Sequence, residues 1–384
     1  MRKFKIGLGL AAFILIAAFL FVQLSLVPST DAKMNPVRLH PPIAPSKTAK
    51  NLHKNLRIAD LHTDSLLWKR NPAKRHDYGH ADLPRLREGG VTLQVFSAVT
   101  KSPKGLNFGE NAADAPDDIT TLALAQLWPL RTWNSIYERA AYQAQRLQKL
   151  EARPKNKLKI VRSAEDMNIE DGRMLAVLLT EGAHPLEGKI ENIARLKAEG
   201  YRIMGLQHFF DNELGGSMHG QSKAGLTEFG REAVLEMRRQ GIIIDVAHSS
   251  EQVVRDVLAI TKDPIMISHG GIVSHCPRTA NRNLPDKLTK AIAARGGIIG
   301  IGYFEGAICD ITPKGIAKAI IDAIAIVGED AVALGSDFDG TVETAIDASE
   351  LAAITDALIK EKVSEDVIAK VMGENVYRFL KENL

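Results

Sequence analysis

The chain has 384 residues, of which 45% are hydrophobic and 25% are charged, so it is long enough for one large globular domain or two small ones. Its formal net charge of +3 is small, and Arg2, Lys3 and Lys5 near the N-terminus account for it. The nearly neutral remainder has no basic stripe, which excludes a nucleic-acid-binding protein. Cys276 and Cys309 lack the CxxC spacing of a structural zinc site.

Residues 1–27 predict a membrane-targeting segment. Three basic residues precede a charge-free apolar run over residues 6–22, which continues to residue 27. A basic flank before an apolar run is typical of an export signal, and the flank stays in the cytoplasm. The length of the run and a weak cleavage signal at Thr30-Asp-Ala32 leave both a transmembrane anchor and a removed signal peptide open. Either one predicts an extracytoplasmic protein, which we expect in a bacterial periplasm, anchored to the inner membrane or secreted.

Residues 28–50 predict an extended linker, because they contain five prolines and no periodic apolar pattern. His40 lies in this linker and has no predicted role.

From residue 51 to residue 384, short apolar runs alternate with amphipathic helical stretches, which is typical of repeated βα units. We expect eight strands, over residues 58–64, 91–98, 175–180, 203–208, 242–248, 265–269, 298–304 and 331–337. The predicted fold class is therefore α/β, a (β/α)8 TIM-like barrel. A doubly wound sheet is the alternative, but the first strand lacks the glycine-rich phosphate loop that would support it.

The segment between the second and third predicted strands, residues 99–172, is far longer than a normal crossover. Its central part, residues 117–150, has a helical pattern. We predict a long helical excursion on the outside or rim of the barrel, not a second domain.

Histidines and carboxylates gather at the C-terminal ends of the predicted strands. They are His62, Asp64, Glu181, His208, Asp245, His248, His269, Asp337 and Asp339. In a parallel barrel these ends meet on one face, where active sites lie. Imidazole and carboxylate ligands suit a divalent metal, most commonly zinc. Their number exceeds what one tetrahedral ion uses, and a glutamate that can bridge two ions favours a binuclear site.

Other polar residues are not predicted to be ligands. His184 and His219 fall in loops and are interpreted as structural, and His53, His76 and His80 as surface or supporting residues. Asp245 and Asp60 precede their strand ends, so each either orients a ligand imidazole or is simply buried.

The chain also resembles a known family. The segments that carry the resemblance are Asp60-Leu-His-Thr-Asp64, residues 81–94, Thr180-Glu-Gly182, Asp245-Val-Ala-His248, Ser268-His269, Arg282-Asn-Leu-Pro-Asp286, Gly335-Ser-Asp-Phe-Asp-Gly340 and Met372-Gly-Glu-Asn-Val-Tyr377. They are similar to the membrane (renal) dipeptidases of peptidase family M19, which are metallopeptidases with amidohydrolase-like barrels. The resemblance runs from about Leu56 to Phe379 and implies a zinc enzyme that hydrolyses dipeptides; acceptance of a C-terminal D-residue stays open.

Carried over residue by residue, the resemblance implies two zinc ions per subunit and a hydroxide that bridges them as the nucleophile. The implied ligands are His62 and Asp64 for one ion, His248 and His269 for the other, and Glu181 as the bridge. A homodimer is a further expectation from the family.

The resemblance also assigns roles beyond the metal. It implies that His208 polarises the scissile carbonyl, that Arg282 binds the substrate carboxylate and that Asp337 transfers the proton. Period-two alternation points Asp339 the same way, so Asp339 stays an alternative to Asp337. The family carries a disulfide near Cys276 and Cys309, which implies their pairing; two buried thiols are the alternative.

Two loops depart from the usual family pattern. They are Gly270-Gly-Ile-Val-Ser-His275 and Phe209-Phe-Asp-Asn212, both expected to line the substrate pocket. A second function therefore stays open. The same metal site could serve a hydrolase whose substrate is another amide, a β-lactam or an N-acyl amino acid. A binding protein without activity is disfavoured, because the full set of site residues is present.

Overall fold

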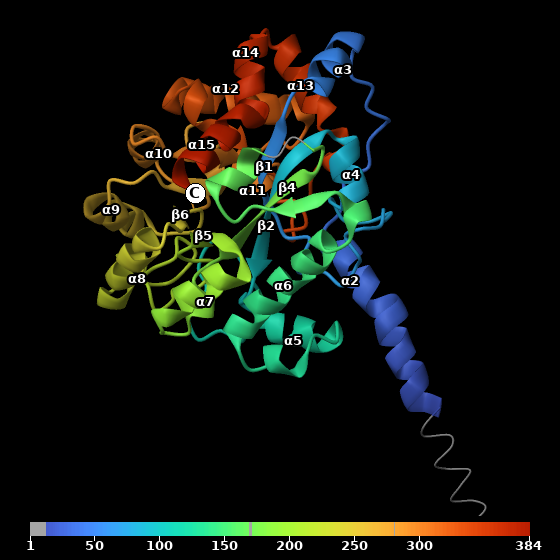
Figure 1. Cartoon of the computed structure of the whole chain (residues 1–384), viewed down its shortest axis with the longest axis vertical. Helices are drawn as coiled ribbons and strands as arrows, with labels where there is room; N and C mark the ends of the chain where they lie inside the picture. The colour runs from blue at the N-terminus through green and yellow to red at the C-terminus, as the bar shows by residue number, and fades with distance from the viewer. Residues whose placement is uncertain (1–12, 169–170, 280) are drawn as a thin grey trace, which may run out of the picture.

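The structure is a computed structural model that describes residues 13–168, 171–279 and 281–384. Its centre is a closed barrel of eight parallel strands surrounded by helices (Figure 1). The barrel strands are β1 (Ile58–Thr63), β2 (Val91–Val99), β4 (Met174–Glu181), β5 (Tyr201–Gly205), β6 (Ile243–Asp245), β7 (Met266–Gly270), β8 (Ile298–Ile301) and β9 (Val332–Leu334). β2 pairs with β4 and β1 with β9, which closes the ring and confirms the predicted TIM-like barrel.

Helices cover the outside of the barrel. They include α4 (Leu83–Glu88), α6 (Ile136–Glu151), α7 (Glu191–Glu199), α8 (Glu228–Arg239), α9 (Glu251–Ile260), α10 (Asp286–Ala293), α12 (Pro313–Val327), α13 (Ala352–Lys360) and α14 (Glu365–Ala369). Several begin at a side-chain cap, such as Thr227 before α8 and Ser250 before α9, which satisfies an otherwise unpaired backbone N–H.

Period-two alternation along the strands separates two apolar layers. In β4, Leu175, Val177 and Leu179 point into the barrel, whereas Ala176 and Leu178 point outward to the helices. The inner layer also includes four residues of α15 (Asn375–Asn383): Val376, Tyr377, Phe379 and Leu380. α15 therefore closes the N-terminal end of the barrel and leaves the C-terminal strand ends for the site.

The long excursion between β2 and β4 lies outside the barrel, as predicted. It holds α5 (Asp118–Ala125), α6, and a three-residue strand that the sequence analysis missed, β3 (Leu158–Ile160). β3 pairs in parallel with the first residues of β4, and β5 pairs with the later residues of β4. Three residues are too few to give a strand signal in the sequence.

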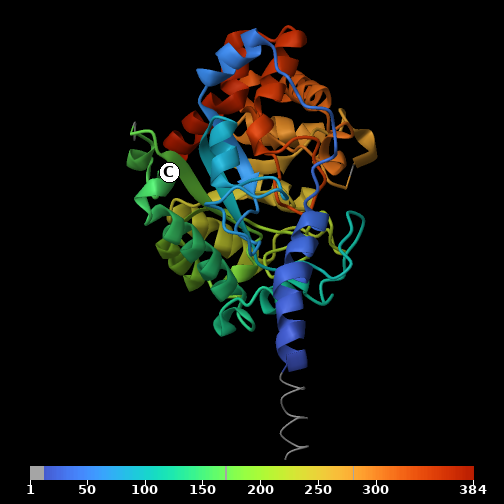
Figure 2. The ribbon, with the colours of Figure 1, turned by 90° about the vertical axis from the view of Figure 1, so that its right-hand side faces the viewer.

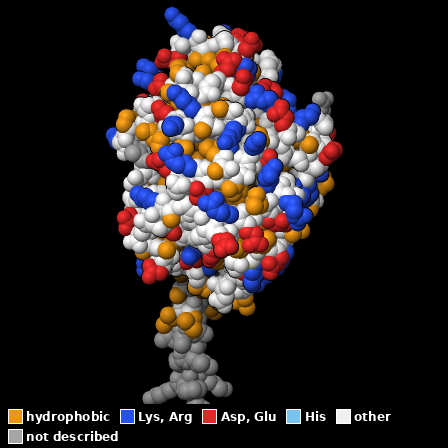
Figure 3. Space-filling view, turned by 90° about the vertical axis from the view of Figure 1, so that its left-hand side faces the viewer, with side chains coloured by type: hydrophobic (Ala, Val, Ile, Leu, Met, Phe, Trp, Pro, Cys, Tyr) orange, Lys and Arg blue, Asp and Glu red, His pale blue; other side chains and the backbone are white. Residues whose placement is uncertain are grey.

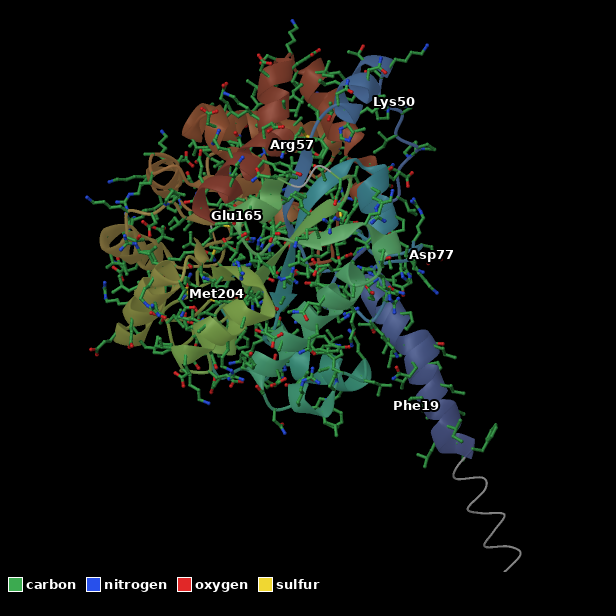
Figure 4. The ribbon with its side chains drawn as sticks, viewed as in Figure 1. Phe19, Lys50, Arg57, Asp77, Glu165 and Met204 are labelled. Atoms are coloured by element: carbon green, nitrogen blue, oxygen red, sulfur yellow. A yellow bond between two sulfur atoms is a disulfide. The ribbon has the colours of Figure 1, made fainter. Side chains whose placement is uncertain are left out.

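The N-terminal region differs from the prediction of an extended linker over residues 28–50. One helix runs from Phe13 to Met34 and includes α2 (Val27–Met34), and α3 (Lys47–Lys54) precedes the first strand. Pro28 does not stop the first helix, because a π-helical turn over Val22–Leu26 directly precedes it. The helix projects from the body, and the chain then runs along the barrel to α3 (Figure 2). Side chains such as Phe19 point away from the protein (Figure 4).

Cys276 and Cys309 form a disulfide in the structure, with their Cα atoms 5.8 Å apart. It joins the loop after β7 to the end of α11 (Glu305–Ile308), beside the mouth of the barrel.

Removal of this disulfide should destabilise the protein. The bridge closes a loop with a sequence separation of 33 residues, for which chain entropy predicts about 4 kcal/mol of stabilisation. The double variant Cys276→Ala/Cys309→Ala should therefore unfold at a lower temperature than the wild type in thermal denaturation. Reducing agent should lower the wild-type midpoint to that of the variant and leave the variant unchanged. Equal midpoints without reductant would contradict the prediction.

Candidate active site

The carboxylate of Glu181 lies at the centre of the site. β4 ends at this residue, and its Oε1 atom faces the Nε2 atoms of four histidines. The distances are 3.0 Å to His248, 3.4 Å to His269, 3.5 Å to His208 and 3.7 Å to His62. All five side chains are buried, so the structure brings the predicted strand-end residues together in one water-poor cluster.

Two further carboxylates complete the cluster. His62 Nε2 lies 3.5 Å from Asp64 Oδ1 and 3.9 Å from Asp337 Oδ1. Three sets have ligand atoms within 4.8 Å of one another: His62, His269 and Asp337; Glu181, His208 and His248; and His62, Asp64 and Glu181. Each set has the nitrogen and oxygen donors that a divalent cation such as zinc prefers.

Several buried polar atoms of the cluster have no hydrogen-bond partner among the described residues. They are both ring nitrogens of His62, Asp64 Oδ1, Glu181 Oε2 and His248 Nδ1. His248 Nε2 also lies 3.0 Å from His269 Nε2, where only one of the two nitrogens can carry the proton between them. Buried polar groups are rarely left unpaired in proteins. The cluster therefore fits metal ions as the partners of these atoms.

A chain of hydrogen bonds behind the cluster fixes the orientation of the His269 imidazole. Ser268 Oγ donates to Asp245 Oδ2 at 2.6 Å, so it can only accept from His269 Nδ1, 2.9 Å away. The proton then resides on Nδ1, and the lone pair of Nε2 faces Glu181. Asp245 therefore orients an imidazole. Asp60 instead joins β1 to β9, because its carboxylate accepts from the backbone N–H and the hydroxyl of Ser336.

The charges of the cluster are strongly coupled. Burial alone would raise the pKa of Glu181, but the imidazoles of His208 and His62 hold it well below its usual value. Burial, with the nearby negative charges of Asp64 and Glu181, raises the pKa of Asp337 well above its usual value. Burial lowers the pKa of His248 well below that of a free imidazole. Three carboxylates in one buried site repel one another, and bound cations would relieve this repulsion.

The turn after β9 separates Asp337 from Asp339. Asp337, Asp339 and Thr341 all have positive φ, at 62°, 67° and 62°, which is strained for residues other than glycine. Asp337 faces the cluster. Gly340 has to be glycine here, because a Cβ atom would lie 2.0 Å from Asp337 Oδ1.

Asp339 points away from the cluster into a buried ion pair. Arg70 contacts its carboxylate, and the backbone N–H of His80 donates to Asp339 Oδ1 at 2.7 Å. Trp68 Nε1 donates to the Asp339 carbonyl at 2.7 Å. These contacts hold the strained turn in place. Asp337 is therefore the aspartate of this turn that belongs to the cluster, whereas Asp339 is held in the ion pair with Arg70.

A cavity of about 910 Å³ opens beside the cluster. Arg282 lines it, buried over the ring of Phe304, and donates to the carbonyls of Ala247 and His269 at 3.2 Å each. His208 also lines it and donates from Nδ1 to the Lys101 carbonyl at 3.1 Å, which directs Nε2 toward Glu181. Arg282 and His208 thus line the same cavity beside the cluster.

Sequence reasoning missed some of the surroundings. His219 is buried, its ring stacks on Phe209 at 4.4 Å between centroids, and it lies 5.2 Å from the ring of His248. His184 is buried close behind Gly182, and burial lowers the pKa of its imidazole to about 3. Both residues lie in loops without a periodic pattern, so no sequence signal placed them near the cluster.

The N-terminal helix also reaches the cavity, which the sequence analysis did not predict. Leu26, Val27, Thr30, Lys33 and Met34 contribute to the cavity wall. Two buried residues near the end of this helix, Asp31 and Asn35, connect it to the turn after β9 and to the arginine that contacts this turn. Asp31 lies 3.4 Å from the Arg70 guanidinium, and Asn35 Oδ1 accepts from the backbone N–H of Thr341 at 2.9 Å.

A buried His/Asp/Glu cluster at the C-terminal end of a (β/α)8 barrel defines the class of metal-dependent hydrolases. Within that class, the model of the membrane dipeptidase family, peptidase family M19, matches residues 46–383, so the chain belongs to this family and is a metallopeptidase. The resemblance seen in the sequence is thereby confirmed.

Relatives and solved structures agree with this assignment. An uncharacterized dipeptidase of Schizosaccharomyces pombe is 25% identical over 360 residues, covering 87% of this chain and 82% of the relative. Dipeptidase tcpJ of Claviceps purpurea is 26% identical over 315 residues, covering 79% and 69%. The structure of dipeptidase AC, a metallopeptidase of family M19, superposes with a TM-score of 0.68 at 26% identity, covering 85% of this chain and 98% of that one.

A metallopeptidase from Rhodobacter sphaeroides shares the fold, with a TM-score of 0.69 at 24% identity over 86% of this chain and 99% of that chain. Its structure holds a phosphinate mimic of the dipeptide L-Ala-D-Ala.

Asparagine substitutions at the two aspartates of the turn should have opposite effects on stability. In metal-free protein at neutral pH, Asp337→Asn should stabilise by about 1 kcal/mol. Because the pKa of Asp337 is raised, folding at this pH must either protonate its carboxyl or bury its charge beside two other carboxylates, and asparagine avoids both costs. Asp339→Asn should destabilise by about 3 kcal/mol, because it removes one of the two anions, Asp339 and Asp31, that balance the charge of the buried Arg70. Thermal unfolding after chelation measures both. A shift in the same direction for both variants would contradict the assignment of the two residues.

Proposed function

We propose that the protein is a binuclear zinc dipeptidase held at a membrane by its N-terminal helix. The observation that carries the metal centre is the position of Glu181 Oε1, 3.0–3.7 Å from four imidazole nitrogens. The second carboxylate oxygen of Glu181 has no hydrogen-bond partner in the part of the chain that the structure describes, which suits a carboxylate that bridges two ions.

The proposed ligands divide into two sets around this bridge. His62 and Asp64 would hold one ion, and His248 and His269 the other. Bound there, the ions supply Lewis-acid polarisation of the scissile carbonyl and activation of a water molecule.

The remaining polar groups have distinct roles in the proposal. His208 donates from Nε2 to the carbonyl oxygen of the substrate as negative charge develops on it; with Nδ1 bonded to Lys101, this donation requires the doubly protonated ring. Asp337 accepts a proton from the attacking water and passes it to the leaving amine. Burial, which raises the pKa of Asp337 in the metal-free protein, suits a carboxylate that must hold a proton briefly.

Arg282 supports a substrate with a free carboxylate. Its buried guanidinium lines the cavity near the cluster, and a planar pair of N–H donors matches a carboxylate. Dipeptides have this group, but so do N-acyl amino acids and β-lactams, which are the substrates of the second candidate function. Membership of the membrane dipeptidase family favours dipeptides over N-acyl amino acids and β-lactams as substrates.

The helix from Phe13 to Met34 supports an uncleaved membrane anchor. Its most apolar 18-residue stretch has a mean hydropathy of 2.1, and 6% of that stretch is buried in the protein. The basic residues that precede it favour an extracytoplasmic body, in a bacterial cell the periplasm. Cleavage after Ala32 would cut α2 beside the buried Asp31, which favours retention of the helix.

Metal analysis should find about two ions per chain after dialysis against zinc, as a binuclear site requires. Glu181→Gln keeps the size of the side chain but removes the bridging charge, so zinc affinity should fall by about 10-fold to 100-fold. Mass spectrometry of the dialysed protein and calorimetric titration measure the two quantities. Glu213→Gln, at an exposed glutamate, is the control and should bind zinc like the wild type. One ion per saturated wild-type chain would refute the binuclear proposal.

The zinc-loaded full chain should hydrolyse dipeptides in a library of L,L and L,D compounds. The L,D compounds are included because the Rhodobacter sphaeroides protein holds an L-Ala-D-Ala mimic. Asp337→Asn should retain zinc and lose about 1,000-fold in kcat, the scale of a general acid–base contribution. N-acetyl-D-amino acids test the second candidate function. Cleavage of these controls alone, or full activity of Asp337→Asn, would overturn the proposal.

A further inference from the structure

A charge-free stretch of the surface lies beside the N-terminal helix. Residues 119–130 contain no Asp, Glu, Lys or Arg, in a chain of which 25% is charged. Leu124, Leu127 and Leu130, at every third position of this stretch, are 43%, 51% and 73% exposed. Single exposed leucines are ordinary on protein surfaces, but a group beside another apolar element marks a contact surface. We call these three residues the leucine patch.

The same stretch separates the patch from the active-site cavity. α5 buries Ile119 and Ala123 against Trp68 and Trp128, and Leu122 and Ala125 line the cavity. The stretch therefore already has its core contacts, and the leucine patch is on the side that the core does not use.

The backbone at the patch is strained. Leu127 has a φ of 60°, a left-handed conformation that glycine or asparagine adopts at lower cost. The Trp128 N–H bonds to the Ala123 carbonyl at 2.8 Å and fixes this turn at the end of α5. Strain that presents an apolar side chain to solvent indicates a function for that side chain.

A hydrogen bond places the patch at the depth of the membrane boundary. Gln23 of the helix donates from Nε2 to the Ala125 carbonyl at 2.9 Å, and Lys69 contacts the Gln23 amide. A hydrocarbon core of about 30 Å requires about 20 helical residues, so a span that begins after Lys5 ends near Ser25. Gln23, and α5 with it, thus lies at the outer boundary of the lipid.

We propose that the leucine patch inserts into the lipid interface and, together with the helix, holds the catalytic end of the barrel against the membrane. This inference rests on the membrane anchor of the proposed function. Hydrophobic side chains gather at the base of the body, where the helix leaves it (Figure 3). Because α5 and the helix both line the cavity, the active site then opens at the membrane surface.

The test uses the full chain in lipid nanodiscs of phosphatidylcholine and phosphatidylglycerol, one chain per disc. Leu127→Cys and Leu130→Cys are each labelled with a nitroxide; the native Cys276–Cys309 pair is oxidised and takes no label. Collision rates with oxygen, which concentrates in lipid, and with a water-soluble nickel complex are compared. Leu20→Cys on the helix is the lipid reference, and Leu235→Cys, an exposed leucine of α8, is the matched water reference.

Insertion predicts an oxygen-to-nickel collision ratio at residues 127 and 130 several-fold above that at residue 235 and close to that at residue 20. A ratio equal to that at residue 235 would overturn the inference and leave the anchor intact. Low collision rates with both reagents would show a protein partner, such as a second copy of the chain, and would also overturn it. A water-like ratio at residue 20 would refute the anchor and the inference with it, whereas the dipeptidase proposal is tested separately by turnover.

Discussion

The convergence of four imidazoles on one buried carboxylate is the interaction on which the rest of the structure depends. Glu181 reaches them only because a closed barrel brings the ends of β1, β5, β6 and β7 to one face. Burial of so many ionisable groups is costly unless each finds a partner. The barrel holds the histidines and carboxylates of the cluster in fixed positions, and residues behind them, such as Asp245, fix the orientation of the imidazoles. Cations bound by these nitrogen and oxygen donors would balance the negative charge of the carboxylates.

The same requirement explains the strained turn after β9. Asp337 enters the cluster only with a left-handed backbone, and Asp339 and Thr341 share this conformation. Each such residue costs on the order of 1 kcal/mol or more, so the surroundings must determine the turn strongly. Support comes from the Asp64 N–H, which bonds to the Phe338 carbonyl at 2.8 Å, and from the contacts of Arg70 and Asn35. The segment that follows the N-terminal helix thereby becomes part of the site.

Local patterns in the sequence were enough to predict the barrel and to place the strand-end residues in one cluster. Period-two alternation predicted that His62 and Asp64 point the same way, and parallel pairing of β1 with β2 and of β2 with β4 brings the end of β1 near the end of β4. Features that depend on distant contacts were not predictable. Asp337 and Asp339 give the same local signal, and contacts with Arg70 and His80, far away in the chain, distinguish them. His219 reaches the cluster through an irregular loop. The predicted linker began at Pro28, because the π-helical turn that lets the helix continue past this proline leaves no pattern in the sequence.

The path of the chain from the helix to the barrel determines which end of the barrel would face the membrane of the proposed anchor. The helix contacts the catalytic end, yet β1 must begin at the opposite end, because parallel strands all run toward the site. The 12 residues between Met34 and Lys47 cover this distance, and Figure 2 shows them along the side of the barrel before α3. An extended chain of this length spans about 40 Å, enough to pass the whole barrel. A short linker would have placed the N-terminal end of the barrel toward the membrane; this long one allows the catalytic end to face it.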